Sequence, residues 1–163
     1  VVSATSESKG ILSHHLHSEG KYAKELWIET PSAQMYPRLT NELVEEGRHH
    51  LKMNGREVFK QAVKRFPEVI LECLEHNNIN PEDIDLFLPH QANIRINNMV
   101  KQKLGLRDDQ VFNNIHKYGN TTSATIPILL AEAHENGRIK DGDLILMAAF
   151  GSGFTWGASL MRW

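Results

Sequence analysis

Apolar residues recur at helical spacing in three stretches of the chain, at residues 54–78, 93–104 and 123–135. In the longest stretch the apolar positions are spaced by four and three residues and comprise Phe59, Val63, Phe66, Ile70 and Cys73. Pro67 lies in the middle of that stretch and lacks a backbone N–H, so we expect it to kink the helix. Gly105 follows the second stretch and is a typical helix stop.

Short apolar runs outside these stretches are typical of β-strands. The predicted strands occupy residues 10–17, 26–28, 85–89, 111–115, 144–150 and 154–162. Turn-forming residues at 18–20 join the first two, and residues 30–50 have no sustained period, which predicts a long irregular loop. The run at 144–150 is continuously apolar, as expected of a strand that is covered on both faces. Helices that alternate with such strands indicate the α/β class.

The composition is that of a globular protein without a strong charge bias. The chain has 163 residues, of which 40% are apolar and 23% charged, and its formal net charge is −2. Because there is no basic excess, nucleic acid is not the expected partner. The longest apolar run is far shorter than the ~20 residues that span a membrane, so no membrane association is expected. The single cysteine allows no internal disulfide and no cysteine-based zinc site, and it favours a cytoplasmic location.

Both ends of the sequence have strand character. Val1 and Val2 resemble the end of a strand whose beginning lies outside the chain, and the sequence closes at Trp163 directly after the last predicted strand. We therefore expect the chain to be a fragment of a longer protein.

Three features that could carry chemistry have simpler explanations. Among nine histidines, only His15 and His17 would share a face of one predicted strand, and without a carboxylate or third ligand at a suitable spacing no metal site is expected. Cys73 lies on the apolar face of a predicted helix, which favours a buried core residue over a nucleophile. The run Gly-Ser-Gly at 151–153 joins two predicted strands, which fits a tight turn better than a dinucleotide-binding loop or a nucleophile elbow.

His90 and Asn120 occupy equivalent positions in the predicted α/β pattern. His90 comes directly after a buried strand and before a helix, and Asn120 precedes the next helix. Functional sites in α/β proteins assemble at the carboxyl ends of strands. Position alone is equally compatible with a structural histidine and with a pair of polar side chains that converge on one substrate atom.

Several longer motifs occur in a fixed order along the chain. They are GIL at 10–12, HLH at 15–17, MNGREVFK at 53–60, LPHQANIRI at 88–96, KYGNT at 117–121 and AFGSGFTWGA at 149–158. Together they closely resemble the C-terminal half of β-ketoacyl-acyl-carrier-protein synthase III, a condensing enzyme of the thiolase fold. The resemblance covers nearly the whole chain and is weakest at 30–48. It implies a mixed sheet covered by helices in a three-layer α-β-α arrangement.

This family initiates fatty-acid synthesis by a decarboxylative condensation of an acyl-CoA primer with malonyl-acyl-carrier protein. The resemblance implies that His90 and Asn120 are the histidine and asparagine of a Cys–His–Asn triad. Their two N–H donors would stabilise the negative charge that decarboxylation builds on the malonyl thioester oxygen. The nucleophilic cysteine of the family belongs to the N-terminal half, and Cys73 does not match its motif. We therefore expect the isolated chain to be inactive as a synthase.

The resemblance also assigns binding roles. Gly151, Ser152 and Gly153 correspond to a glycine-rich loop whose backbone N–H serves the oxyanion hole, with serine in place of the commoner glycine. The residues expected to line the pantetheine tunnel are Gly55, Phe59, Ala92 and Asn93. Arg95 and Lys103 would meet the acidic carrier protein, although a solvated helix face explains this pair equally well. No cofactor is expected, because the coenzyme A thioester and phosphopantetheine are substrates.

The partners implied by the resemblance are acyl carrier protein, acyl-CoA, the N-terminal half of the same enzyme and, in the complete protein, a second copy in a homodimer. Two alternatives remain open. One is a related thiolase-fold acyltransferase that passes its acyl group to a hydroxyl or an amine. The other is a non-catalytic domain that binds acyl groups or the carrier protein. The residues alone do not indicate the acyl-chain preference.

Overall fold

The main sheet contains strands from both ends of the chain. Residues 4–163 are described in the structure, a computed structural model, so the strand predicted at Val1 and Val2 lies outside the described residues. The four strands of the sheet are β1 (Gly10–Ser18), β4 (Leu86–Pro89), β5 (Leu144–Gly151) and β6 (Thr155–Arg162). They lie in the order β1-β6-β5-β4, with β4 and β5 parallel and the other neighbours antiparallel. The sheet is therefore mixed, as expected.

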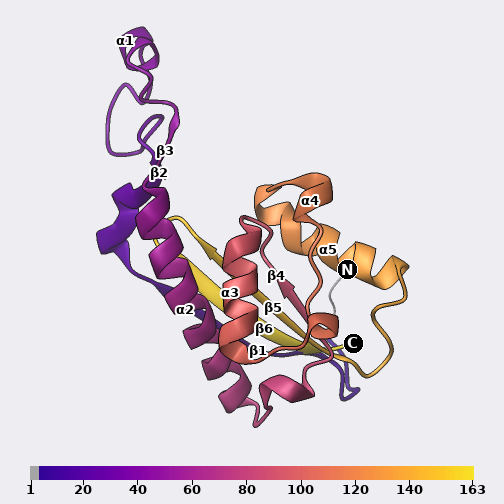
Figure 1. Ribbon diagram of the computed structural model, residues 1–163. Helices are drawn as coiled ribbons and strands as arrows, with labels where there is room; N and C mark the ends of the chain where they lie inside the picture. The colour runs from indigo at the N-terminus through magenta and orange to yellow at the C-terminus, as the bar shows by residue number, and fades with distance from the viewer. Residues whose placement is uncertain (1–3) are drawn as a thin grey trace.

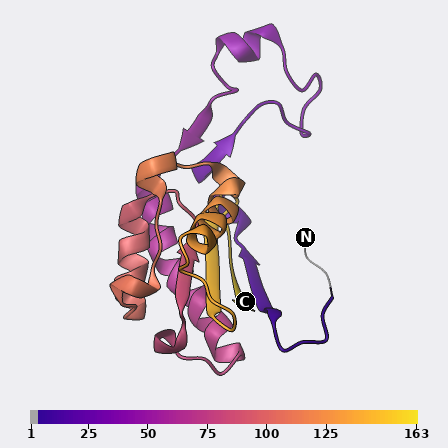
Figure 2. The ribbon, with the colours of Figure 1, turned by 90° about the vertical axis from the view of Figure 1, so that its right-hand side faces the viewer.

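Helices cover both faces of this sheet. They are α2 (Gly55–His76), α3 (Ile94–Leu104) and α5 (Thr125–Glu135). Because successive strand residues point to opposite faces, Phe87 and Leu146 pack into one apolar cluster with α2 and α3. Their neighbours Leu88 and Ile145 pack into a second cluster with α5. Figures 1 and 2 show α2 and α3 side by side and α5 apart from them, which confirms the three-layer α/β arrangement.

The cap residues in the sequence set the ends of α2 and α3. Asn54 accepts a hydrogen bond from the Glu57 backbone N–H at 3.3 Å, and Asn93 accepts one from the Arg95 N–H at 2.9 Å. Gly105 ends α3 in the left-handed conformation, with φ +68°. The buried residues of α3 are Ile96, Asn97, Val100 and Leu104. The predicted helices are thus confirmed, with α5 preceded by a short 3-10 turn.

Cys73 lies in the core, as predicted. Its side chain is 0% exposed, and its sulfur is 3.6 Å from the hydroxyl of Ser13. Burial raises the pKa of the Cys73 thiol, which disfavours the reactive thiolate. The kink expected at Pro67 within α2 stays a prediction. Among residues 4–163, no helix combines the length and apolar character that a membrane crossing requires.

The segment that follows β1 differs from the sequence prediction. A 3-10 helix (Gly20–Glu25), in place of a simple turn, leads to β2 (Leu26–Ile28). That strand pairs with β3 (Leu51–Met53) in a separate two-stranded antiparallel sheet. The predicted loop between them also contains α1 (Asn41–Glu45), which is capped by the hydroxyl of Thr40. We call residues 26–53 the arm, and Figures 1 and 2 show it extending away from the main sheet.

The strand predicted at 111–115 is wrong. Val111 makes only an isolated parallel bridge to Phe87, and Ile115 is the first residue of α4 (Ile115–Tyr118). The chain turns here because the backbone N–H groups of Asn114 and Ile115 are bonded to the Gln91 side chain instead of to a neighbouring strand. The remaining 3-10 turns are η2 (Pro81–Asp83), η3 (Asp108–Gln110) and η4 (Thr122–Ala124).

Candidate functional site

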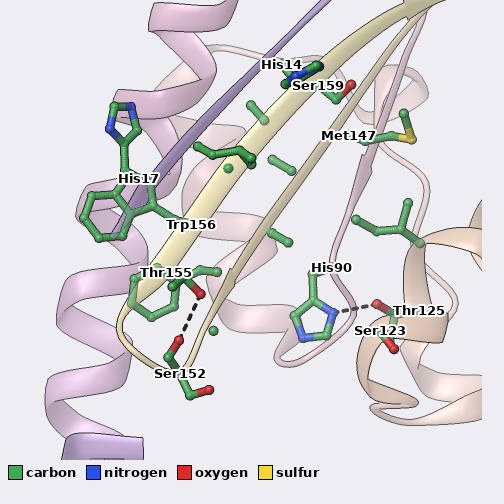
Figure 3. A pocket seen from close by; sticks show the side chains of 18 of the residues that line it. His14, His17, His90, Ser123, Thr125, Met147, Ser152, Thr155, Trp156 and Ser159 are labelled. Atoms are coloured by element: carbon green, nitrogen blue, oxygen red, sulfur yellow. Dashed lines mark hydrogen bonds between the residues drawn. The ribbon is translucent and has the colours of Figure 1, made fainter. Parts of the chain in front are cut away.

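His90 stands at the carboxyl end of β4. Its backbone N–H donates to the Ala148 carbonyl at 2.9 Å, and this backbone hydrogen bond to β5 fixes the residue at the end of β4. The imidazole is half-buried, and its Nδ1 lies 2.5 Å from the hydroxyl oxygen of Thr125 (Figure 3). Burial lowers the pKa of His90, because the charged imidazolium loses water there. The ring is therefore neutral at physiological pH.

Gln91 ties the loop after β4 to the loop that leads into α4. It is 1% exposed, and its amide nitrogen donates to the Pro89 carbonyl at 2.8 Å and to Asn113 Oδ1 at 3.1 Å. Its amide oxygen accepts from the N–H groups of Asn114 and Ile115, each at 3.1 Å. All four hydrogen-bonding positions of the side-chain amide are thus used. One buried side chain fixes both the loop that carries His90 and the start of α4.

Asn120 follows the end of α4. Its Oδ1 accepts the backbone N–H of Thr122 at 2.9 Å, an arrangement that fixes the orientation of the amide. The Nδ2 hydrogens are then available as donors. α4 itself is held against α5 by Glu132, which accepts from Asn114 Nδ2 at 2.7 Å and pairs with Lys117. These contacts lower the pKa of Glu132, with Lys117 as the largest cause, so its carboxylate stays charged.

His90 and Asn120 face one cavity of about 1010 Å³ on the side of the sheet that carries α5. Gly151 and Ser152 at the end of β5 line the same cavity, and its apolar wall includes Met147, Phe150 and Trp156. Figure 3 shows His90, Thr125, Met147, Ser152 and Trp156 around this space. The structure therefore brings together four residues that the sequence assigned to catalysis and to the oxyanion loop.

The connection between β5 and β6 is a tight turn, as predicted. Gly153 has φ +130°, and a Cβ at this position would lie 2.8 Å from Thr155 Cγ2, so a larger residue would be strained. The hydroxyl of Thr155 donates to the Ser152 carbonyl at 2.9 Å and closes the turn. Ser152 itself is exposed, which explains why a side chain is tolerated there. Gly153 is not among the cavity-lining residues.

The residues predicted to line a pantetheine tunnel lie outside this cavity. They are Gly55, Phe59, Ala92 and Asn93, at the N-terminal ends of α2 and α3. The guanidinium of Arg95 lies 5.6 Å from the centre of the Phe59 ring, so the two helix ends touch through a cation–π contact. Among the tunnel candidates, Phe59 therefore contacts the carrier-docking candidate Arg95, and neither residue lines the cavity.

Lys103 has a structural contact that the sequence pattern did not predict. Pro67 has no N–H to offer the carbonyl of Val63 one helical turn before it. The ammonium of Lys103 donates to this Val63 carbonyl at 2.7 Å. Lys103 thus satisfies an acceptor of α2 from α3, and it is less free to meet a partner than Arg95.

Two of the three histidines on β1 are joined by a carboxylate that the sequence analysis missed. Glu72 of α2 lies 3.2 Å from His15 Nδ1 and 2.6 Å from His17 Nε2. The hydrogen bond to His17, followed by that to His15, lowers the pKa of Glu72 below its usual range. Within residues 4–163, no group of three or more His, Cys, Asp or Glu side chains is arranged to hold a metal ion.

Two residues of the site were not singled out from the sequence. Gln91 lies inside the motif at 88–96, and Thr125 is the first residue of α5. Both are buried polar side chains, at 1% and 3% exposure. Thr125 could have been identified as a polar residue on the face of the helix that also carries Leu129 and Ala133. Gln91, in contrast, lies in a loop and leaves no such signal.

Known proteins match the chain over its whole length. β-Ketoacyl-acyl-carrier-protein synthase III of Oceanobacillus iheyensis is 40% identical over 163 residues, which are 100% of this chain and 47% of that protein. The crystal structure of 3-oxoacyl-acyl-carrier-protein synthase III from Aquifex aeolicus superposes with a TM-score of 0.85 at 41% identity, over 98% of this chain and 46% of that chain. The Thermus thermophilus enzyme gives a TM-score of 0.87 at 40% identity, over 99% of this chain and 49% of that chain.

This chain therefore spans about half the length of the curated relatives that it matches. The family description that matches it, the C-terminal part of 3-oxoacyl-acyl-carrier-protein synthase III, covers residues 74–163, more than half of the chain. These similarities confirm the resemblance and the thiolase-like fold expected from the motifs. The chain belongs to the 3-oxoacyl-acyl-carrier-protein synthase III family, and its residues 74–163 match the C-terminal part of that family.

Proposed function

We propose that the chain supplies the histidine and asparagine half of a ketoacyl-acyl-carrier-protein synthase III active site. The complete enzyme would condense an acyl-CoA primer with malonyl-acyl-carrier protein at the start of fatty-acid synthesis. One observation carries this proposal. His90 and Asn120 reach the same cavity from two different loops, and each can offer an N–H donor there.

The chemistry of decarboxylation suits two neutral donors. When the bond between the malonyl carbon and its carboxylate breaks, CO₂ leaves and the electron pair moves onto the thioester oxygen. Donors fixed at that oxygen stabilise the enolate, and loss of one such donor costs about 3–4 kcal/mol in other enzymes. The lowered pKa of His90 supports this role, because a neutral imidazole presents one N–H and draws no second proton into the site.

The enolate carbon then attacks an acyl thioester held on a cysteine. The thioester carbon–sulfur bond breaks, and the cysteine leaves as a thiolate. A backbone N–H of the Gly151–Ser152–Gly153 turn would stabilise the oxyanion formed in this step. Because that donor belongs to the backbone, Ser152 can replace a glycine without removing it.

The nucleophile would come from the N-terminal half of the enzyme, and Cys73 is too buried to substitute for it. We therefore expect the 163-residue chain alone to show no condensation activity. The acyl-CoA, the carrier protein, the N-terminal half and a second copy in a homodimer are the partners of the complete enzyme under this proposal. No cofactor is required by the reaction.

The test separates the two half-reactions in the complete enzyme. His90→Ala and Asn120→Ala should each suppress malonyl decarboxylation while acyl-enzyme formation from labelled acyl-CoA continues. His116→Ala and Asn136→Ala remove the same residue types from exposed positions on α4 and after α5, and should change neither step. Equal loss of acylation and decarboxylation would contradict the assigned roles. A product made without CO₂ release would instead favour transfer to a hydroxyl or an amine.

The docking of the carrier protein at Arg95 is tested separately. Arg95 is exposed near the start of α3 and would attract an acidic carrier protein, which raises the encounter rate more than the final affinity. Arg95→Glu should raise the KM for malonyl-acyl-carrier protein several-fold and weaken its salt dependence. Turnover of a small malonyl thioester is the control. Equal losses with both substrates would show that Arg95 supports the fold or the tunnel instead.

A further inference from the structure

Thr125 is the direct neighbour of the His90 ring. It is the first residue of α5, its side chain is 3% exposed, and its Oγ1 lies 2.5 Å from His90 Nδ1 (Figure 3). In that contact either atom could carry the hydrogen. If the hydroxyl donates, Nδ1 is an acceptor and the ring proton sits on Nε2. If Nδ1 donates, Nε2 is left with a lone pair and cannot act as a donor.

The surroundings of the hydroxyl decide between these two arrangements. Within residues 4–163, the Thr125 hydroxyl has no hydrogen-bond acceptor other than His90 Nδ1. A buried hydroxyl that kept its hydrogen unpaired would be destabilised, so its hydrogen points to Nδ1. Burial also keeps His90 neutral, so only one of its two nitrogens carries a hydrogen.

We infer that Thr125 is a positioning residue whose hydroxyl holds His90 in the tautomer with the hydrogen on Nε2. This inference rests on the proposed function, because it explains how His90 presents a donor to the enolate oxygen. Thr125 does not touch the reacting atoms in this scheme. It acts through His90, as residues that bond the second nitrogen of functional histidines do in other sites.

An NMR experiment tests the tautomer of His90 and requires no measurement of enzymatic activity. Two-bond ¹H–¹⁵N correlations of the imidazole rings distinguish a hydrogen on Nε2 from one on Nδ1. With nine histidines in the chain, the His90 signal is assigned by its loss in His90→Gln. We expect the Nε2–H form in the unaltered chain. A hydrogen on Nδ1 would overturn the inference, and this outcome does not depend on any Thr125 variant folding.

Two substitutions of Thr125 then show whether the hydroxyl is responsible. Thr125→Val keeps the shape but removes the donor, so the His90 signal should become a mixture of both tautomers. Thr125→Ser keeps the hydroxyl and should retain the signal of the unaltered chain. An unchanged tautomer in a folded Thr125→Val chain would show that Thr125 only packs against the ring, and would overturn the inference.

The same variants in the complete enzyme connect the tautomer to the reaction. Thr125→Val should slow malonyl decarboxylation about tenfold with little change in KM, since loss of a buried hydrogen-bond partner is of that size. Thr125→Ser should restore most of the rate. If the unaltered enzyme catalyses no condensation, the proposed function fails while the NMR result stands. If the unaltered enzyme is active and Thr125→Val is equally active, the positioning role of Thr125 is wrong while the proposed function stands.

Discussion

Every residue of β4 is buried, whereas Thr30 is the only buried residue in the arm at 26–53. The arm exposes large apolar side chains, such as Leu51 at 62% and Met53 at 60%. Two strands of three residues each are too short to be stable through apolar contacts alone. The arm and the sheet must therefore be stabilised by different interactions.

Ion pairs connect the two sides of the arm. Glu29 accepts from Arg48 Nε at 2.8 Å and from Lys52 Nζ at 2.7 Å, which joins the two sides of the arm. The sheet instead relies on apolar burial from both faces. This difference explains why the sequence predicted one region well and the other poorly, because apolar burial leaves a periodic pattern and ion pairs between distant residues do not.

The largest expected effect comes from removing a core side chain of β4. Phe87 is 0% exposed, so Phe87→Ala should lower the free energy of unfolding by about 3–5 kcal/mol. The matched change in the arm, Leu51→Ala, should stay within about 0.5 kcal/mol, because that side chain already contacts water. Urea unfolding of both variants measures the comparison. Equal losses would show that the arm has a core of its own.

A smaller effect is expected from the polar network beneath the site. Gln91→Leu leaves the N–H groups of Asn114 and Ile115 without their acceptor, so the free energy of unfolding should fall by about 2–3 kcal/mol. Gln102→Leu on the exposed side of α3 is the control and should have little effect. If Gln91→Leu unfolds at the same urea concentration as the control, the network does not determine the loop geometry.

The hydrogen bonds of Gln91 are a part of the site that the sequence did not predict. The α/β pattern left open whether His90 and Asn120 converge, the family resemblance assigned both to one site, and the structure places both at one cavity. The strand predicted at 111–115 failed because Val111 and its neighbours look extended in isolation. The buried Gln91 amide, more than twenty residues earlier, bonds the N–H groups at the start of α4, and Glu132 of α5 bonds Asn114, so contacts distant in the sequence direct this segment into α4.

The helix ends were predictable because the residues that cap a helix are its neighbours in the sequence. Asn54 and Gly105 act on residues next to them in the sequence, so their effect is visible there. Lys103 was assigned to carrier docking from the family resemblance, its charge and its place on the helix. Its contact with the Val63 carbonyl depends on how α2 and α3 pack, which a single-helix pattern does not contain.

The contact between α2 and α3 gives a third, smaller prediction. Lys103→Met should lower the free energy of unfolding by about 1 kcal/mol, because the Val63 carbonyl loses its donor at a partly exposed site. In a Pro67→Ala background the new N–H can bond to that carbonyl, so the same Lys103 change should cost much less. A double-mutant cycle measured by urea unfolding isolates the coupling. Additive effects would show that Lys103 is simply a solvated side chain.

The smallest effect concerns the arm and depends on pH. Arg48, and next Lys52, lower the pKa of Glu29 from 4.5 to about 2. Because this pKa is lower in the folded arm than in the unfolded chain, the ion pairs stabilise the arm fully above pH 4.5 and lose their effect as the pH falls toward 2. Hydrogen-exchange protection of the Thr30 N–H, which bonds to the Arg48 carbonyl at 3.3 Å, should fall over that range.

Glu29→Gln removes the titrating group and should abolish this pH dependence while lowering protection at neutral pH. Glu45→Gln, at an exposed position on α1, is the matched control and should leave the profile unchanged. Added salt should reduce protection in the unaltered arm but not at the amides of β4, since partly exposed ion pairs join the arm whereas β4 is surrounded by buried apolar side chains. If Glu29→Gln retains the original pH profile, the ion pairs do not stabilise the arm, and the contrast with the sheet must have another cause.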